Sequence, residues 1–552
     1  MDVIGASVQA IADAVRISYG PCGKDQLVVT ESQKLVTNSA SRILALARPG
    51  SPVAKVLLRH LCKFAEEAGD GTATLALLLD GAVRFCVKAI NDGRASRQEL
   101  LRCFAFIEAA ALKESAQLLQ EIQSGGPVEM VFSNLAKTFF GANFPLEVSG
   151  KLSQICWQWL KANSREELSA TAGDLRRGEL IKVPLVGPTS TDAADSTASA
   201  TLERQHLMSA VLAHSTMPCD LGEGRAAVLD DHVVTLPVRV TAPGNLLDRL
   251  QQHLLLAAEQ LWQAGIRLVF CASCVHEEWT GSLARRGICL LHLVDEEELG
   301  LLEGKVGKIR RIRPGSEDVA ALTAGSFSLQ SLRPFQSLSA AKLAGTRAFW
   351  HVKPKSEDTP CTLVLAASSL GIEHRLAILR LLAVVAPGLE DPSSIVHGGL
   401  AFELGMLRLA HSKVLSLRAG SRAGAEVFGL EDDNKAARLE MLSWSLLEAA
   451  LLSVLETFLA NMGEGSASSK RTARLLVTLP EAELREMPGL QAIGQSKVHF
   501  GFVLSPGIGC QATWQPTESS RLKHDLLRAL CSLGRQFCRL DPATVKTSAS
   551  RP

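Results

Sequence analysis

The sequence predicts an α/β multidomain protein in which helical N- and C-terminal regions flank an α/β middle. Three observations support this fold class. Apolar residues recur at helical spacing over residues 1–123 and beyond 397, whereas short β-like runs alternate with helical stretches between about 205 and 367. The chain has 552 residues, 47% of them hydrophobic, which suffices for about three or four domains. This pattern suggests one terminal domain that the middle interrupts.

The N-terminal region is predicted to be mostly helical. Residues 7–18 form a first helix that stops at Gly20-Pro21, and a pair of strands follows at 26–30 and 34–37. Further helices are predicted from about 52 to 68 and from 72 onward.

Strands and helices are predicted in the middle and the C-terminal region from the same kind of apolar pattern. Residues 267–274 and 287–294 are β-like runs separated by a helical stretch, and residues 361–367 give another buried strand. Helices are predicted from about 372 to 387 and from 397 onward. The most apolar helix, at 441–462, carries two glutamates eight residues apart on one side. It is therefore predicted to be an amphipathic core helix, and no membrane span is expected.

Charge and cysteine content exclude several classes of protein. The 58 Lys and Arg residues nearly balance the 57 Asp and Glu residues, so no global field favours nucleic acid or an anionic membrane. The 13 cysteines are odd in number and irregularly spaced, which indicates reduced thiols rather than a disulfide framework. We expect no signal peptide and a cytoplasmic protein. Cys271, Cys274 and His276 suggest zinc only weakly, because a second ligand pair is missing.

Three glycine-rich turns are candidates for chemistry. In the second turn, the glycines allow close backbone approach to a ligand, and the first amides of the helix that follows bind phosphate well. Asp70 is a tentative Mg²⁺ ligand through its oxygens, and the alternative is an ordinary helix start capped by Asp70. The third turn alone is an ordinary loop-to-helix junction. The candidate nucleotide-binding residues are Gly20, Pro21, Gly23, Gly69, Asp70, Gly71, Thr72, Ala73, Thr74, Gly398 and Gly399.

These turns form part of an ordered series of motifs. The series consists of YGPCGKDQ at 19–26, VTNSASRIL at 36–44, SPVAK at 51–55, GDGTAT at 69–74, TLVLAA at 362–367 and HGGLAFE at 397–403. In order and approximate spacing it resembles the group II chaperonin (TCP-1/cpn60) superfamily along nearly the whole chain.

The resemblance implies a chaperonin fold with a helical equatorial domain, a small intermediate domain and an α/β apical domain. It also implies an ATP and Mg²⁺ site in the equatorial domain and client binding by the apical domain. The segments are 1–123 equatorial, 124–188 intermediate, 189–345 apical, 346–394 intermediate and 395–552 equatorial.

The sequence departs from the family at the catalytic aspartates. The resemblance implies three aspartates around the phosphates and the metal. Here Ser39 occupies the first position, Asp70 is kept, and ungapped counting from Ala367 or Gly398 places the third at Leu382. A leucine neither orients water nor holds a metal. We therefore expect little or no ATP turnover, whereas nucleotide binding stays open.

The same departures resemble the McKusick–Kaufman/Bardet–Biedl branch of chaperonin-like proteins. Tyr19 stands where the family has leucine, and residues 220–228 and 348–354 resemble segments of that branch. The branch implies a role in BBSome assembly for ciliogenesis near the centrosome or basal body. Its partners would be other chaperonin-like proteins, cytosolic chaperonin subunits and BBSome subunits. Two alternatives remain: an active ATP-dependent ring subunit, and a scaffold that binds no nucleotide. Residues 218–250 are expected to form a reduced apical protrusion.

Overall fold

The computed structural model describes most of the two helical ends and shorter stretches of the middle. The described residues are 2–30, 34–124, 126–164, 168–175, 181–182, 206–208, 212–214, 224–229, 246–272, 275, 277–292, 308–309, 334–341, 349–354, 362–364, 369–419, 433–463, 465–487, 490–493, 498–502 and 516–540.

The chain divides into two compact units. Unit 1 consists of residues 1–157, 168–176 and 378–552, and unit 2 consists of residues 158–167 and 177–377. Two helices, α8 (Leu146–Asn163) and α15 (Ser369–Glu390), contribute residues to both units. One terminal unit is thus interrupted by an insertion, as the sequence pattern suggested. The finer division into three domains remains a prediction.

Unit 1 is mainly helical. Besides parts of α8 and α15, its helices are α1 (Asp2–Arg16), α2 (Ala40–Leu46), α3 (Pro52–Ala68), α4 (Thr72–Asn91), α5 (Arg97–Phe106), α6 (Leu112–Glu121), α7 (Val128–Gly141), α9 (Leu168–Leu175), α16 (Ala401–Arg418), α18 (Asp433–Asn461), α19 (Ser466–Thr478), α20 (Glu481–Arg485) and α21 (Ser520–Arg539). A π-helical turn, η1 (Ile107–Ala111), joins α5 to α6, and a 3-10 turn, η5 (Pro392–Ser394), follows α15.

Three short antiparallel strand pairs complete unit 1. The first, β1 (Gln26–Val29) with β2 (Lys34–Thr37), confirms the strand pair predicted from the sequence. The other pairs are β13 (Ile395–His397) with β16 (Thr517–Ser519), and β14 (Leu490–Ile493) with β15 (His499–Phe502).

Local sequence signals account for the boundaries of the helices near the first turns. Proline at the first position of α3 has the dihedral angle that a helix start needs, and α3 ends at Gly69 in the left-handed conformation (φ 79°). α5 begins with a capping box between Ser96 and Glu99. The predicted helix at 52–68 and the helix starting at residue 72 are confirmed.

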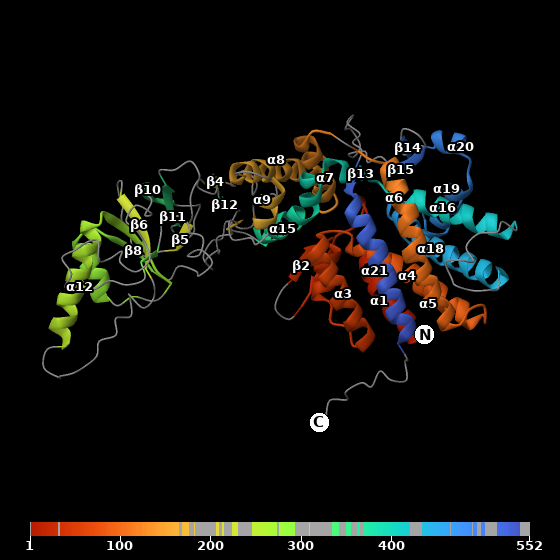
Figure 1. Cartoon of the computed structure of the whole chain (residues 1–552), viewed down its shortest axis with the longest axis horizontal. Helices are drawn as coiled ribbons and strands as arrows, with labels where there is room; N and C mark the ends of the chain where they lie inside the picture. The colour runs from red at the N-terminus through yellow and green to blue at the C-terminus, as the bar shows by residue number, and fades with distance from the viewer. Residues whose placement is uncertain are drawn as a thin grey trace, which may run out of the picture. The chain divides into compact units, whose positions relative to one another are not determined.

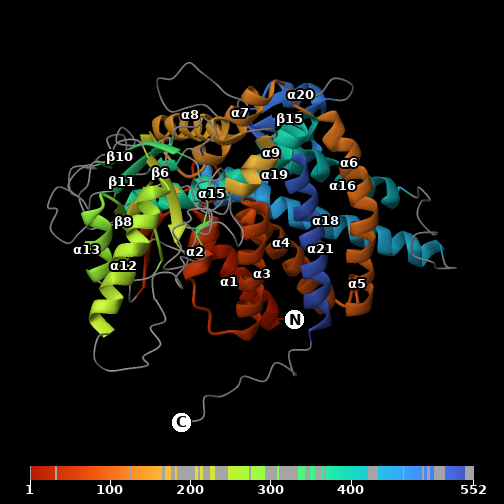
Figure 2. The same ribbon diagram turned by 60° about the vertical axis from the view of Figure 1, so that its left-hand side comes forward.

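The core of unit 1 joins the two ends of the chain. Helix α21 packs against α4 and α5, and α18 packs against α4, α5 and α16, so the C-terminal helices lie beside the N-terminal ones (Figures 1 and 2). The buried apolar residues of this core lie between Ile4 and Ile122 and between Val396 and Cys538. Long-range packing, rather than local propensity, therefore holds the two ends together.

Helix α18 is long and apolar enough, by length and composition, to cross a membrane; it is the one helix of this kind among the described residues. Its position explains its apolarity. Leu446, Leu447, Leu451 and Val454 are at most 2% exposed in the core of unit 1. The structure thus places α18 where the sequence predicted a core helix.

Unit 2 contains both helices and β-sheets, as the sequence predicted for the middle of the chain. A seven-stranded sheet has the order β5 (Leu212–His214), β11 (Phe349–Pro354), β10 (Pro334–Ala341), β6 (Gly224–Leu229), β7 (Ile266–Phe270) and β8 (Cys289–Leu291), and β9 (Lys308–Ile309) pairs with β6. A smaller sheet has the order β3 (Ile181–Lys182), β12 (Thr362–Val364), β4 (His206–Met208). Helices α12 (Leu246–Gln263) and α13 (Glu277–Arg285) form a core with β7 and β8.

Strands β6, β7, β8 and β9 pair in parallel, and β7 is buried along nearly its whole length. A run of β-branched and aromatic residues in β7 fits such a buried parallel strand. Much of residues 218–250, where a reduced protrusion was expected, lies outside the described residues, so that expectation remains a prediction.

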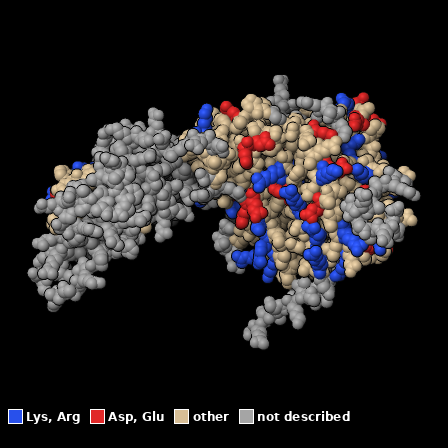
Figure 3. Space-filling view, viewed as in Figure 1, with Lys and Arg blue, Asp and Glu red and all other residues tan. Residues whose placement is uncertain are grey.

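The surface of unit 1 carries both signs of charge. On the face that Figure 3 shows, Lys and Arg are interspersed with Asp and Glu, and no single sign covers it. This agrees with the near balance of charges in the sequence.

Candidate functional site

The three glycine-rich turns come together around a cavity of about 190 Å³ in unit 1. Of the residues predicted to bind nucleotide, Gly23 and Gly398 are not among its lining residues. The predicted residues that line it are Gly20, Pro21, Gly69, Asp70, Gly71, Thr72, Ala73, Thr74 and Gly399. Ser39 lines it as well. Segments more than 300 residues apart in sequence thus meet at one site.

The second turn runs directly against α15. Gly69 and Gly71 both have positive φ angles (79° and 82°), which side-chain-bearing residues rarely adopt. A Cβ atom at Gly69 would lie 2.5 Å from the carbonyl oxygen of Arg380. Only glycine therefore allows the turn between α3 and α4 to approach α15 this closely.

The start of α4 has no side-chain cap. Gly71 is its N-cap residue, and the Asp70 Oδ1 atom accepts a hydrogen bond from the Gly71 amide at 2.7 Å. The first amides of a helix have no partner within the helix. Thr72, Ala73 and Thr74, which carry these amides, line the cavity. Such an arrangement of amides suits a phosphate group.

Asp70 lines the cavity and is an exposed residue. Partial loss of hydration and the charge of Glu518 raise its pKa above the ordinary value, whereas the Gly71 amide and, more weakly, the cations of Arg380 and Lys523 lower it without reversing the direction.

Tyr19 contributes a phenol to the first turn. Its hydroxyl lies 3.5 Å from the Thr74 Oγ1 atom. Burial, and then the charge of Glu403, raise the pKa of Tyr19 well above its ordinary value. The phenol therefore stays protonated at neutral pH and is available as a hydrogen-bond donor.

Lys523 on α21 is a buried cation between two carboxylates. Its Nζ atom donates to the Glu403 Oε1 atom at 2.7 Å and also contacts the Glu518 carboxylate. Burial alone would lower the pKa of Lys523, but the two glutamates raise it above its ordinary value. The lysine therefore stays charged, and these two glutamates are engaged with it.

The third turn is held by backbone bonds and contains strained geometry. The Gly398 amide donates to the Pro516 carbonyl at 2.7 Å, and the Phe502 amide donates to the Gly399 carbonyl at 2.8 Å. Leu400 has a φ angle of 61°, the one positive φ of a non-glycine residue in the described chain. Such strain is often found at functional sites.

Helix α15 presents Arg380, not Leu382, to the cavity. Leu382 is 1% exposed and lines a separate hollow with Phe64 and Pro387. Arg380 donates to the Ser39 Oγ atom at 2.7 Å and to the Ser41 hydroxyl, and its guanidinium lies 5.7 Å from the centre of the Phe139 ring. Leu382, the position reached by the ungapped count, is therefore not among the residues that line this cavity.

Sequence reasoning overlooked Arg380. One signal was present: it is a single cation in the apolar run LAILRLLAVV at 376–385. Arg380 is half-buried, and a partly buried arginine requires polar partners, so a charge in such a run indicates a polar environment on one face of the helix.

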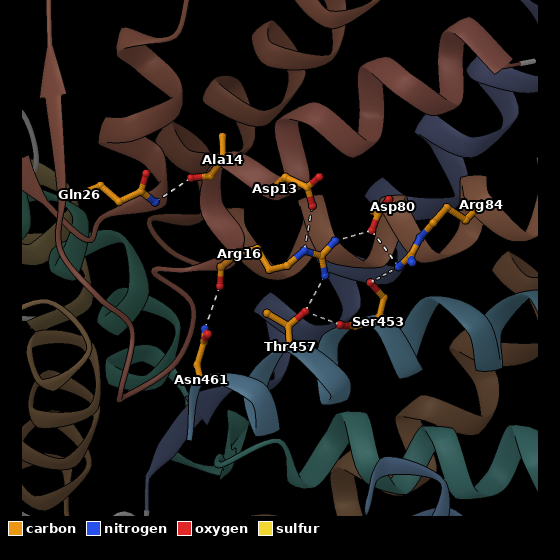
Figure 4. A network of polar contacts seen from close by, with 9 residues as sticks. All are labelled: Asp13, Ala14, Arg16, Gln26, Asp80, Arg84, Ser453, Thr457 and Asn461. Atoms are coloured by element: carbon orange, nitrogen blue, oxygen red, sulfur yellow. Dashed lines mark hydrogen bonds and ion pairs between the residues drawn. The ribbon is translucent and has the colours of Figure 1, made fainter. Parts of the chain in front are cut away.

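A second polar network supports the first turn (Figure 4). Arg16 donates to the Asp80 Oδ2 atom at 2.7 Å and to the Thr457 hydroxyl at 2.8 Å. The Asn461 side-chain amide donates to the backbone carbonyls of Arg16 and Tyr19 at 2.8 and 2.7 Å. These contacts tie the end of α1 to α4 and α18, and so fix where the turn begins.

The donor set fits phosphate better than magnesium. Glycine-turn amides, two threonine hydroxyls and a guanidinium all donate to anions. Of the three carboxylates lining the cavity, Glu403 and Glu518 are bound to Lys523, which leaves Asp70 near the cation of Arg380. A magnesium ion would be repelled by that cation. Within the described part of the chain, no group of three or more His, Cys, Asp or Glu residues could hold a metal ion.

The weak suggestion of zinc binding by Cys271, Cys274 and His276 remains untested. Cys271 is buried at the end of β7, while Cys274 and His276 lie outside the described residues.

Comparison with known proteins gives one family and several distant relatives. The model of the TCP-1/cpn60 chaperonin family matches residues 11–463. The chain is 23% identical over 462 residues to thermosome subunit beta of Desulfurococcus mucosus, covering 82% of this chain and 86% of the relative. It is 32% identical over 88 residues to T-complex protein 1 subunit delta of Arabidopsis thaliana, covering 16% of each.

Proposed function

Because the chain belongs to the TCP-1/cpn60 chaperonin family, we propose that it assists the folding and assembly of protein complexes without turning over ATP. The observation that carries the second half of this proposal is the guanidinium of Arg380 beside Ser39 in the cavity.

Hydrolysis of ATP needs a carboxylate that positions water and further oxygen ligands that hold the metal. In this cavity Arg380 carries a positive charge, opposite to that of the carboxylate which hydrolysis needs. Ser39 accepts a hydrogen bond from Arg380. Asp70 alone cannot both hold the metal and activate water. The retained glycine turns support continued phosphate binding, which separates this proposal from a scaffold that binds no nucleotide.

The test is phosphate release from ATP by the purified protein. We expect a rate roughly 100-fold or more below that of an ATP-hydrolysing chaperonin, because a positioned general base alone contributes a factor of about 100 or more. Asp70→Ala, purified in parallel, is the matched control, since turnover that survives this substitution comes from a contaminant. Turnover comparable to the active chaperonin, and abolished by Asp70→Ala, would favour an active ring subunit instead.

We further propose that the complex assembled is the BBSome and that the protein acts in the cytoplasm near the centrosome or basal body. The support is the resemblance of Tyr19, residues 220–228 and residues 348–354 to the McKusick–Kaufman/Bardet–Biedl branch. The partners would be other chaperonin-like proteins, cytosolic chaperonin subunits and BBSome subunits.

A tagged pull-down from ciliated cells, analysed by mass spectrometry, tests this proposal. Recovery of BBSome subunits together with chaperonin-like proteins supports it. Recovery of stoichiometric ring subunits with many unrelated clients contradicts it and favours a general folding role.

A further inference from the structure

Helix α15 places the cation of Arg380 in the cavity that the first residues of α4 also line. The backbone carbonyl of Arg380 lies so close to Gly69 that a Cβ atom there would be 2.5 Å away. The Arg380 side chain lines the same cavity as the amides at the start of α4. A guanidinium and a helix N-terminus, both of which favour anions, therefore converge on one space.

The guanidinium is held in a defined orientation. Its Nη1 atom donates to the hydroxyls of Ser39 and Ser41, and its plane lies near the Phe139 ring. Hydroxyl groups orient a guanidinium without cancelling its charge, because they are neutral acceptors. Arginine held in this way is organised to form further hydrogen bonds to phosphate oxygens.

Four other charged residues line the cavity: Asp70, Glu403, Glu518 and Lys523. Lys523 and the glutamates Glu403 and Glu518 form their own buried cluster. Asp70 is the remaining carboxylate, and it is exposed, so solvent screens its charge more than it would screen a buried one. If all five groups are ionised, the cavity carries one net negative charge, so attraction of an anion here depends on the local position of the Arg380 guanidinium and the first amides of α4 rather than on the net charge of the cavity.

We propose that this cavity binds a chain of phosphate groups without a divalent metal ion, and that Arg380 supplies the positive charge which a metal would otherwise provide. The inference rests on the proposed function in that it treats the glycine turns as a phosphate site that does not hydrolyse its ligand. The shared chemistry is a polyphosphate, carried by a nucleoside triphosphate or by inorganic triphosphate.

Titration calorimetry of the purified full-length protein tests this proposal, with ATP and inorganic triphosphate as separate probes. Each probe is measured in EDTA and in excess Mg²⁺. We expect binding of at least one probe in EDTA, with equal or weaker affinity in Mg²⁺, because the metal neutralises part of the charge that Arg380 attracts. Tighter binding of ATP than of triphosphate identifies a nucleotide as the ligand, and equal or tighter binding of triphosphate identifies a free polyphosphate.

Two substitutions of Arg380 distinguish an effect of its charge on binding from a loss of folding. Arg380→Gln removes the charge and keeps a hydrogen-bond donor to Ser39, and we expect roughly tenfold or greater loss of affinity in EDTA. Arg380→Asp introduces a carboxylate, and we expect binding only in Mg²⁺. Arg102→Gln, at an exposed position on α5, is the matched control and leaves affinity unchanged. Circular dichroism and the melting temperature without ligand establish that each variant is folded.

The inference is overturned if the wild-type protein binds neither probe in EDTA, if Mg²⁺ is required, or if folded Arg380→Gln binds as tightly as wild type. These results are independent of phosphate release. Turnover of ATP would refute the proposed lack of hydrolysis, while triphosphate binding in EDTA would still decide the role of Arg380.

Discussion

His374 is a buried histidine on α15, six residues before Arg380. It is 1% exposed, and burial lowers its pKa from 6.5 to about 4. The folded protein therefore favours the neutral ring, whereas the unfolded chain takes up a proton near pH 6.5. Stability that depends on this neutral ring is present above that pH and is lost as pH falls toward the folded pKa.

We predict that acidification destabilises the protein through this residue. Between about pH 7 and about pH 5 the loss in free energy of unfolding should be about 2 kcal/mol larger in wild type than in His374→Leu. Urea unfolding followed by circular dichroism at both pH values measures the difference. An identical pH dependence in the two proteins would show that His374 is not the group that titrates.

At the scale of elements, the site depends on the close approach of the α3–α4 turn to α15. Gly69 has a φ angle of 79° and lies against the carbonyl of Arg380, whereas Gly93 at the end of α4 has a φ angle of 66° and open space around it. The two glycines share the backbone conformation and differ in their surroundings.

We predict that Gly69→Ala costs about 3 kcal/mol or more, because the methyl group meets both backbone strain and a carbonyl oxygen. Gly93→Ala is the matched control and should cost about 1–2 kcal/mol for the strain alone. Urea denaturation of both variants measures the two values. Equal losses would mean that the turn and α15 separate easily.

At the scale of the whole molecule, the chain leaves and re-enters the core of unit 1 at adjacent points. The Ser124 amide donates to the Ile395 carbonyl at 2.8 Å, and the His397 amide donates to the Ile122 carbonyl at 2.9 Å. The buried apolar cluster that joins the two ends of the chain has no member among the described residues between Ile122 and Val396. The equatorial boundaries at 1–123 and 395–552 remain a prediction.

We therefore predict that a shortened chain, with residue 124 joined to residue 395 by a short Gly-Ser turn, folds cooperatively. An antiparallel pair of this kind is readily closed by a short loop. Its melting curve and helical circular dichroism check the prediction, and an aggregated or molten product contradicts it. The shortened chain lacks Arg380 and should not bind triphosphate in EDTA.

Local sequence signals were sufficient to predict several helices and strands and the glycine turns of the site. The helix at 52–68, the helix that starts at residue 72, and the strand pair at 26–30 and 34–37 were predictable, because capping residues and apolar periodicity are local signals. The glycine turns were recognisable for the same reason. The ordered series of motifs was enough to predict the chaperonin family, which the family model confirms.

Which residues of α15 line the cavity depends on long-range packing. Residues two apart on a helix point about 200° away from each other, so a shift of two positions exchanges Leu382 in a separate hollow for Arg380 in the cavity. The rotation of α15 is set by packing against Gly69 and Phe139, which are more than 240 residues distant in sequence. Local sequence patterns do not indicate contacts between residues so far apart in the chain. The guanidinium of Arg380 at the cavity, and with it the inferred preference for phosphate without a metal, therefore became visible only in three dimensions.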